Sequence, residues 1–427
     1  DWLIRKSEST VFPRCDQDFQ DVLLDLGDAL RPEAPRAKRQ LCLALVAVSS
    51  EKGSGMAENS KTERGSRVPE LDAVRAMAAL NLMLFHFTHA YSVKYGFTSP
   101  LGFEYSYGKY GTQLFFILSG YVNAMTLLGK GQPLDFLAAR TIRIVPTYLL
   151  VLGMNLVLLL FLPFTLHGNY SIAQVLANLT LVPKLLGYEC LEPVTWTLQI
   201  EILFYAVLLL LYCLGGLQRP VRTLLWYMAV CIAGTWWLNT VRTDFVGTDA
   251  AQLADFWEEL LLLPYMPLFA IGILLYRLRT GASGFGWNLV GLAAAVGTFH
   301  LIDRRDHNTV ATFLLIGLIA GAGWGVIPPL RLRPWVFLSS ISYSLYLLHN
   351  NLGTAFIYYL NQAGLEPWIC FLLVFPFVIG VSALFSFWVE RPLSAGLRAG
   401  WKSWRLRNSP KQLPRLGSNS VMKEATT

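Results

Sequence analysis

Two residues in the first strongly hydrophobic stretch, Arg75 and His86, have side chains that could carry out chemistry inside a membrane. They are eleven positions apart, about three helical turns, so both would lie on nearly the same helix face, roughly 16 Å apart along the axis. Ionisable groups at that depth are costly and are usually functional. A neutral imidazole can take the proton of a hydroxyl that attacks an acyl carbon, and a guanidinium can bind phosphate. We therefore predict a base within the membrane that an anionic substrate reaches from one side.

Each of these residues also has a simpler explanation. His86 could be a structural histidine that is hydrogen-bonded to a neighbouring helix. Arg75 could be an anchor at the membrane interface that pairs with Asp72, one turn earlier. His89 lies one turn beyond His86, which would allow a two-histidine metal site. The sequence offers no evident third ligand, however, and we predict no metal.

Four further polar residues stand out in or beside hydrophobic stretches. Arg140 and Arg143, in FLAARTIRIVPTYLL, are explained equally well by the rule that cytoplasmic segments are basic, or by a polyanionic donor that they bind together with Arg75. Glu201, six residues into the fourth stretch, could pair with a basic group, orient a substrate hydroxyl or serve structure. His349 lies in LSSISYSLYLLHNNL, where the small hydroxyl residues favour close packing of a polar-faced core helix.

The composition identifies the class of protein that positions these residues. Of 427 residues, 54% are hydrophobic and 15% are charged, against about 25% charged in soluble domains. We therefore expect an all-α, polytopic transmembrane helical bundle. The net charge of +7 fits basic residues on cytoplasmic loops, and we expect no nucleic-acid partner.

The hydrophobic pattern predicts about ten membrane-spanning helices, with both termini in the cytoplasm. The short loops that would then be cytoplasmic carry nine basic residues, against six on the longer outer loops, in agreement with the positive-inside rule. The expected spans are 73–93, 110–128, 144–164, 195–214, 222–239, 257–276, 286–301, 309–326, 336–360 and 367–389. The nine basic residues are Lys130, Arg140, Arg143, Arg219, Arg222, Arg277, Arg279, Arg331 and Arg333.

The two ends of the chain differ from the hydrophobic region between them. Residues 1–66 are mixed and polar, and we expect an extension without a folded role, either disordered or upstream of a start at Met56. The rival interpretation is a signal sequence around QLCLALVAVSS, which is too short to span a bilayer. Residues 67–393 would form one transmembrane domain, whose last helix ends at Glu390, and residues 394–427 a basic cytoplasmic tail.

Six stretches that occur in the same order along residues 69–393 carry a resemblance to a known family. They are ELDAVRAMAALNLMLFHF, GTQLFFILSGYV, FLAARTIRIVPTYLL, TWTLQIEILFY, SYSLYLLH and VERP. The chain resembles the membrane acyltransferase-3 family, which includes bacterial O-acetyltransferases of surface polysaccharides and small molecules. Arg75 and His86 match the Arg-X10-His spacing of the family's opening motif.

The resemblance implies an acyltransferase with a cytoplasmic acyl-CoA donor, most simply acetyl-CoA, and an acceptor hydroxyl on a carbohydrate or lipid-linked glycan. His86 would be the general base or a transient acyl carrier. Arg75, with Arg140 and Arg143, would hold donor phosphates or polarise the thioester carbonyl. Trp196 and Glu201 would line the acceptor end. Acyl-CoA would be a co-substrate rather than a bound cofactor, and the bacterial inner membrane would be the location.

Two other classes of protein remain compatible with the pattern. A multi-span transporter or flippase of envelope precursors would also place polar residues near the midplane of the membrane. Transporters often show internal repeats and broken helices in both halves, and the sequence shows no such symmetry. A non-catalytic membrane partner in a glycan assembly complex is the third possibility.

Overall fold

The computed structural model describes residues 68–128, 132–161, 170–246, 248–282, 284–303 and 308–408, and within these ranges it contains helices but no strand. The all-α prediction is confirmed for this part of the chain. The predictions for residues 1–66 and for the end of the tail lie outside the described residues. The longer helices are α3 (Pro69–Phe85), α5 (Tyr110–Leu128), α6 (Pro133–Phe161), α8 (Trp196–Cys213), α9 (Pro220–Asp244), α10 (Asp249–Leu260), α11 (Met266–Arg279), α12 (Phe285–Ile302), α13 (Thr309–Trp324), α14 (Arg333–Gln362), α15 (Pro367–Phe385) and α16 (Arg391–Asn408).

Six helical segments among the described residues are long and apolar enough to cross a membrane, so the chain is an integral membrane protein. The prediction of ten spans and of two cytoplasmic termini stays a prediction. The six segments are Ser106–Leu128, Pro133–Leu158, Pro193–Cys213, Pro220–Asp244, Phe285–Ile302 and Pro367–Asn408.

The expected span 257–276 is not one continuous helix, because the structure forms two helices there. Helix α10 ends at Leu260 and α11 begins at Met266. Leu262, in the turn between them, has a φ of 51°, a left-handed conformation that interrupts a right-handed helix. Pro267 in the first turn of α11 costs no hydrogen bond, because the first amides of a helix lack partners in any case.

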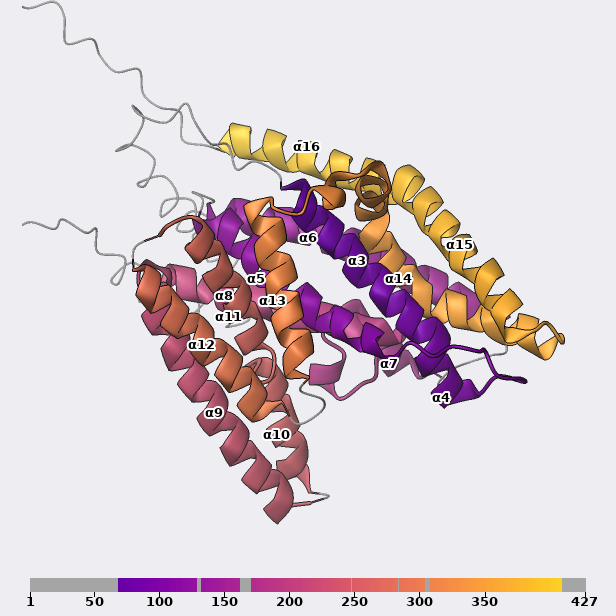
Figure 1. Cartoon of the computed structure of the whole chain (residues 1–427), viewed down its shortest axis with the longest axis horizontal. Coiled ribbons are helices and arrows are strands. Elements are labelled where there is room, and N and C mark those ends of the chain that lie inside the picture. The colour runs from indigo at the N-terminus through magenta and orange to yellow at the C-terminus, as the bar shows by residue number, and fades with distance from the viewer. Residues whose placement is uncertain are drawn as a thin grey trace, which may run out of the picture.

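Two predicted boundaries also moved. The third span begins at Pro133 rather than at residue 144, so Arg140 and Arg143 lie within helix α6. The last span does not end at Glu390, because a π-helical turn, Ser386–Glu390, joins α15 directly to α16. A wider turn relieves the clash between the Pro392 ring and the preceding turn, so the helix bends instead of ending, as Figure 1 shows.

Helices from the two ends of the chain pack against each other in the centre of the bundle. Helix α3 contacts both α5 and α14, α5 packs along α11, and α14 packs along α15 (Figure 1). The predicted polar-faced core helix is α14, whose buried residues include Ser342, Ser344, His349, Asn350 and Asn351. Residues distant in the sequence therefore meet around α3 and α14.

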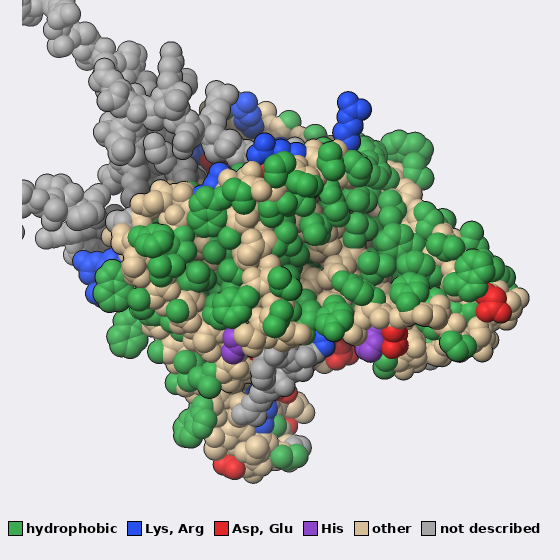
Figure 2. Space-filling model, in the orientation of Figure 1, with side chains coloured by type: hydrophobic (Ala, Val, Ile, Leu, Met, Phe, Trp, Pro, Cys, Tyr) green, Lys and Arg blue, Asp and Glu red, His purple; other side chains and the backbone are tan. Residues whose placement is uncertain are grey.

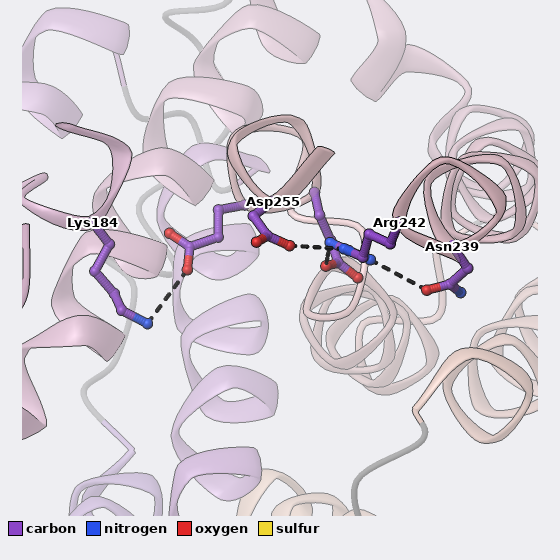
Figure 3. A network of polar contacts seen from close by, with 6 residues as sticks. Lys184, Asn239, Arg242 and Asp255 are labelled. Atoms are coloured by element: carbon purple, nitrogen blue, oxygen red, sulfur yellow. Dashed lines mark hydrogen bonds and ion pairs between the residues drawn. The ribbon is translucent and has the colours of Figure 1, made fainter. Parts of the chain in front are cut away.

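The charged side chains are distributed unevenly over the surface. On the face seen in Figure 2, hydrophobic side chains cover most of the bundle, basic ones gather along the upper edge beside α16, and acidic ones lie toward the lower edge. Ion pairs and hydrogen bonds join α10 to Arg242 of α9 and to Lys184 (Figure 3). Arg242 of α9 binds Asp255 of α10 at 2.7 Å and also contacts Glu258. Lys184 lies 3.6 Å from Glu259.

Candidate active site

One cavity in the described chain collects most of the polar residues that the sequence singled out. It has a volume of about 70 Å³, several times what one water molecule requires. The site residues on its wall come from α3, α5, α6, α8 and α14. They include Arg75, Ser119, Asn123, Arg140, Arg143, Glu201, Tyr205, Tyr343 and Tyr346.

The three arginines of the predicted donor site lie on this one cavity. Arg75 also forms the ion pair with Asp72 considered as its simpler explanation, at 3.0 Å. Arg140 donates to Thr126 at 3.2 Å, its guanidinium lies over the rings of Phe136 and Tyr205, and its buried Nε has no hydrogen-bond partner among the described residues. The cavity therefore offers unused guanidinium donors, which suit an anionic group.

Glu201 also lies on the cavity wall, which gives the wall three basic side chains and one acidic side chain. Ser119 donates to the Glu201 carboxylate at 3.1 Å, and the Tyr205 hydroxyl donates to the same oxygen. Ser119 in turn accepts from Asn123 at 2.9 Å. These contacts fix the carboxylate beside the arginines. Trp196 does not line the cavity, and it packs between Phe116 and Tyr265 instead.

His86 is absent from the cavity wall and lies beside it. It is the first residue of a π-helical turn, His86–Ala90, that joins α3 to the short helix α4 (Tyr91–Tyr95). Such turns are rare and frequently mark functional sites. The His86 ring lies 5.2 Å, centroid to centroid, from the ring of His349 on α14. Tyr346, which does line the cavity, has its ring 5.9 Å from that of His349 and so connects the cavity to the two histidines.

Several residues of the site were not assigned from the sequence. Ser119 and Asn123 lie in GTQLFFILSGYV and Tyr343 and Tyr346 lie in SYSLYLLH, two of the stretches that carried the family resemblance. The signal that could have found them is a row of polar side chains at helical spacing within an apolar span. Tyr343 donates its hydroxyl to the Ile144 carbonyl at 3.0 Å, so its position depends on α6.

A second buried polar cluster surrounds Glu192, just before α8. Glu192 is 2% exposed. It accepts hydrogen bonds from the Asn350 side chain at 3.0 Å and from the backbone N–H of Asn351 at 3.4 Å. Burial raises the pKa of the Glu192 carboxyl to about 8, and the hydrogen bonds from these asparagines oppose that rise. Nothing in the local sequence predicted a buried carboxyl here, because its partners come from α14.

Comparison with known proteins assigns this arrangement to a family. The family model described as an acyltransferase domain matches residues 68–387. The chain is 28% identical over 316 residues to the exopolysaccharide production protein ExoZ of Rhizobium meliloti (strain 1021). The aligned region covers 68% of this chain and 91% of that protein. It is also 27% identical over 303 residues to the acyltransferase MdmB of Streptomyces mycarofaciens. That aligned region covers 66% of this chain and 78% of MdmB. No solved structure matches. The chain therefore belongs to the membrane acyltransferase-3 family and is an O-acyltransferase.

Proposed function

We propose that this enzyme moves an acyl group, most simply acetyl, from cytoplasmic acyl-CoA to a hydroxyl of a carbohydrate or glycan acceptor. The observation that carries the proposal is the cavity on which Arg75, Arg140 and Arg143 converge. Coenzyme A bears several phosphate charges, and a cavity with three guanidinium groups and one carboxylate attracts such a donor. The printed name of ExoZ ties that relative to exopolysaccharide production, which supports a glycan acceptor here.

The residues take the following roles in the proposal. Arg75, with Arg140 and Arg143, binds the donor phosphates or polarises the thioester carbonyl where negative charge develops. His86 is the general base. Glu201 serves the acceptor side from the cavity wall, and Trp196 supports that side through Phe116, the wall residue against which it packs. The protein would lie in the bacterial inner membrane, with its donor on the cytoplasmic side. The basic edge of the surface beside α16 (Figure 2) supports a cytoplasmic position for that edge, because basic residues favour the cytoplasmic side.

The reaction itself requires one proton to move out and back. The acceptor hydroxyl oxygen attacks the thioester carbonyl carbon while its proton passes to His86. A carbon–oxygen bond forms, the carbon–sulfur bond breaks, and the leaving thiolate takes the proton from His86. No other reactant is needed, and the products are the ester and free coenzyme A.

An acyl-transfer assay tests this proposal. Purified protein in nanodiscs is incubated with radiolabelled acetyl-CoA and a panel of cell-envelope glycans, with His86→Ala beside the wild type. We expect transfer by the wild type, and loss of transfer by a correctly folded His86→Ala variant that still binds the donor. His300→Ala, in α12 and away from the cavity wall, is the matched control and should keep wild-type turnover.

The opposite results would overturn the proposal in different places. Wild-type turnover by His86→Ala would remove His86 as the base. A folded wild type that neither binds acetyl-CoA nor transfers its acyl group would remove the acyl-CoA donor. The family match is to an acyltransferase domain, which favours the enzyme over the transporter and non-catalytic interpretations.

A further inference from the structure

His349 is a fully buried histidine whose hydrogen bonds leave one ring nitrogen without a partner. It lies on α14 with 0% of its surface exposed. Its Nδ1 lies 2.8 Å from the Tyr346 carbonyl oxygen and 3.1 Å from the Leu345 carbonyl oxygen. Because a carbonyl oxygen can only accept, Nδ1 carries the proton, and the neutral ring has its lone pair on Nε2.

The lone pair on Nε2 is buried with no hydrogen-bond partner among the described residues. A buried acceptor left without a hydrogen bond is costly, so it normally indicates a donor that is present in the working molecule. Three aromatic rings surround His349: His86 at 5.2 Å, Tyr346 at 5.9 Å and Phe87 at 6.5 Å between centroids. The Tyr346 hydroxyl already donates to the Val194 carbonyl, and Phe87 has no donor. Of these three rings, only that of His86 offers a further N–H donor.

The surroundings keep the two histidines in this relation. Phe87, directly after His86, is fully buried against Gly353 of α14, where a Cβ atom would collide with the Phe87 ring. This close approach holds the π-helical turn of His86 against the helix of His349. The backbone bonds of Nδ1 hold the His349 ring in one orientation and one tautomer. In enzymes that activate a hydroxyl nucleophile, a base takes the hydroxyl proton and a third group commonly holds that base in its orientation.

We propose that His349 is a positioning residue for the His86 base, a role that rests on the proposed function. Nε2 of His349 accepts the ring N–H of His86, which leaves the other nitrogen of His86 unprotonated and free to take the acceptor hydroxyl proton. When that proton arrives, His86 becomes an imidazolium that still donates to His349. The proton then passes from the same nitrogen to the leaving thiolate, so His349 itself gains and loses none.

Three substitutions of His349 separate this role from a structural one. In His349→Asn, the amide can replace Nδ1 as donor to the Tyr346 carbonyl but has no atom at the place of Nε2. His349→Phe keeps the ring volume and loses the acceptor. In His349→Gln, the longer side chain carries an amide oxygen toward the place of Nε2. Each is measured in nanodiscs for kcat, for KM of acetyl-CoA and for thermal unfolding, beside His86→Ala.

We expect kcat to fall on the order of 100-fold in His349→Asn and His349→Phe, with KM of acetyl-CoA unchanged within about twofold. The kcat of His349→Gln should be at least about tenfold higher than that of His349→Asn. Wild-type kcat in folded His349→Asn, with His86→Ala inactive, would overturn this inference and leave the proposed function intact. Equal loss in the Asn and Gln variants with a raised KM would show a structural role and overturn it too. An active His86→Ala would instead overturn the proposed base.

Discussion

Gly120 of α5 and Gly272 of α11 face each other where the two helices cross, and a Cβ atom built on Gly272 would lie 3.0 Å from the carbonyl carbon of Gly120. The same atom would collide with the Ile117 carbonyl oxygen, and one built on Gly120 would collide with the Phe269 carbonyl oxygen. The two backbones are therefore in direct contact, as small residues permit at helix crossings in membranes. Because α5 carries Ser119 and Asn123, this contact also fixes one wall of the cavity.

The first prediction concerns this crossing. Gly272→Ala should destabilise the protein by about 1–3 kcal/mol, because the added methyl group meets backbone atoms that cannot rotate away. The measurement is the thermal unfolding midpoint in detergent. Gly380→Ala in α15 is the matched control, because nothing lies within 4 Å of its added atom, and it should be neutral or slightly stabilising. Equal midpoints for the two variants would contradict the contact described here.

The second prediction concerns donor binding by Arg75. Arg75→Gln should raise KM of acetyl-CoA by about 10–100-fold, because a charged hydrogen bond to a phosphate or thioester oxygen is worth about 1.5–3 kcal/mol. Arg75→Lys should be intermediate, since it keeps the charge and loses the two-pronged geometry. Steady-state kinetics measure both. Arg398→Gln, on the exposed side of α16, controls for the loss of one positive charge and should leave KM unchanged. A normal KM in Arg75→Gln would assign Arg75 to its ion pair with Asp72 alone.

The third prediction separates the two substrates at Glu201. Glu201→Gln should raise KM of the glycan acceptor by about tenfold and change KM of acetyl-CoA by less than about threefold, because the neutral amide is a weaker acceptor for a substrate hydroxyl. Initial rates with one substrate varied at a time supply both constants. Glu366→Gln, at a surface contact with Ser99, is the control. Tighter binding of acetyl-CoA with an unchanged acceptor KM would place Glu201 on the donor side with the three arginines.

The fourth prediction concerns pH and Glu192. The pKa of Glu192 rises from the usual 4.5 to about 8 in the folded protein, so between these values the folded state holds a proton that the unfolded state has released. The contribution of Glu192 to stability should therefore be full below about pH 4.5 and fall as pH rises to about 8, by a total of a few kcal/mol.

Thermal unfolding of wild type and Glu192→Gln from pH 5 to pH 9 checks this sign. The neutral amide does not titrate, so the difference in stability between the two proteins should change in favour of the variant up to about pH 8 and level off above it. A constant difference across the range would mean that the pKa of Glu192 is the same in both states. Because Glu192 lies outside the cavity, the predicted change concerns stability and needs no substrate.

The sequence alone was sufficient for the features that depend on local pattern. Long apolar stretches must become helices in lipid, since only helices satisfy their own backbone hydrogen bonds there, and the described chain is helical. The ordered motifs from residue 69 onward indicated the family that residues 68–387 match. The shared catalytic role that the spacing of Arg75 and His86 suggested stays a prediction. The pairing of Arg75 with Asp72 was also foreseen, because residues three apart are neighbours on any helix.

Tertiary structure alone decided which of these residues meet. Arg75, Arg140, Arg143 and Glu201 share one cavity because α3, α6 and α8 all contribute to its wall, and no spacing within one helix encodes that. Tertiary structure likewise brings the His349 ring beside that of His86 and the Asn350 side chain to the Glu192 carboxylate. In both pairs the two residues come from distant parts of the chain. The break at Leu262 escaped prediction for a related reason: hydrophobicity continues through it, and only the packing of neighbouring helices decides whether an apolar run forms one helix or two.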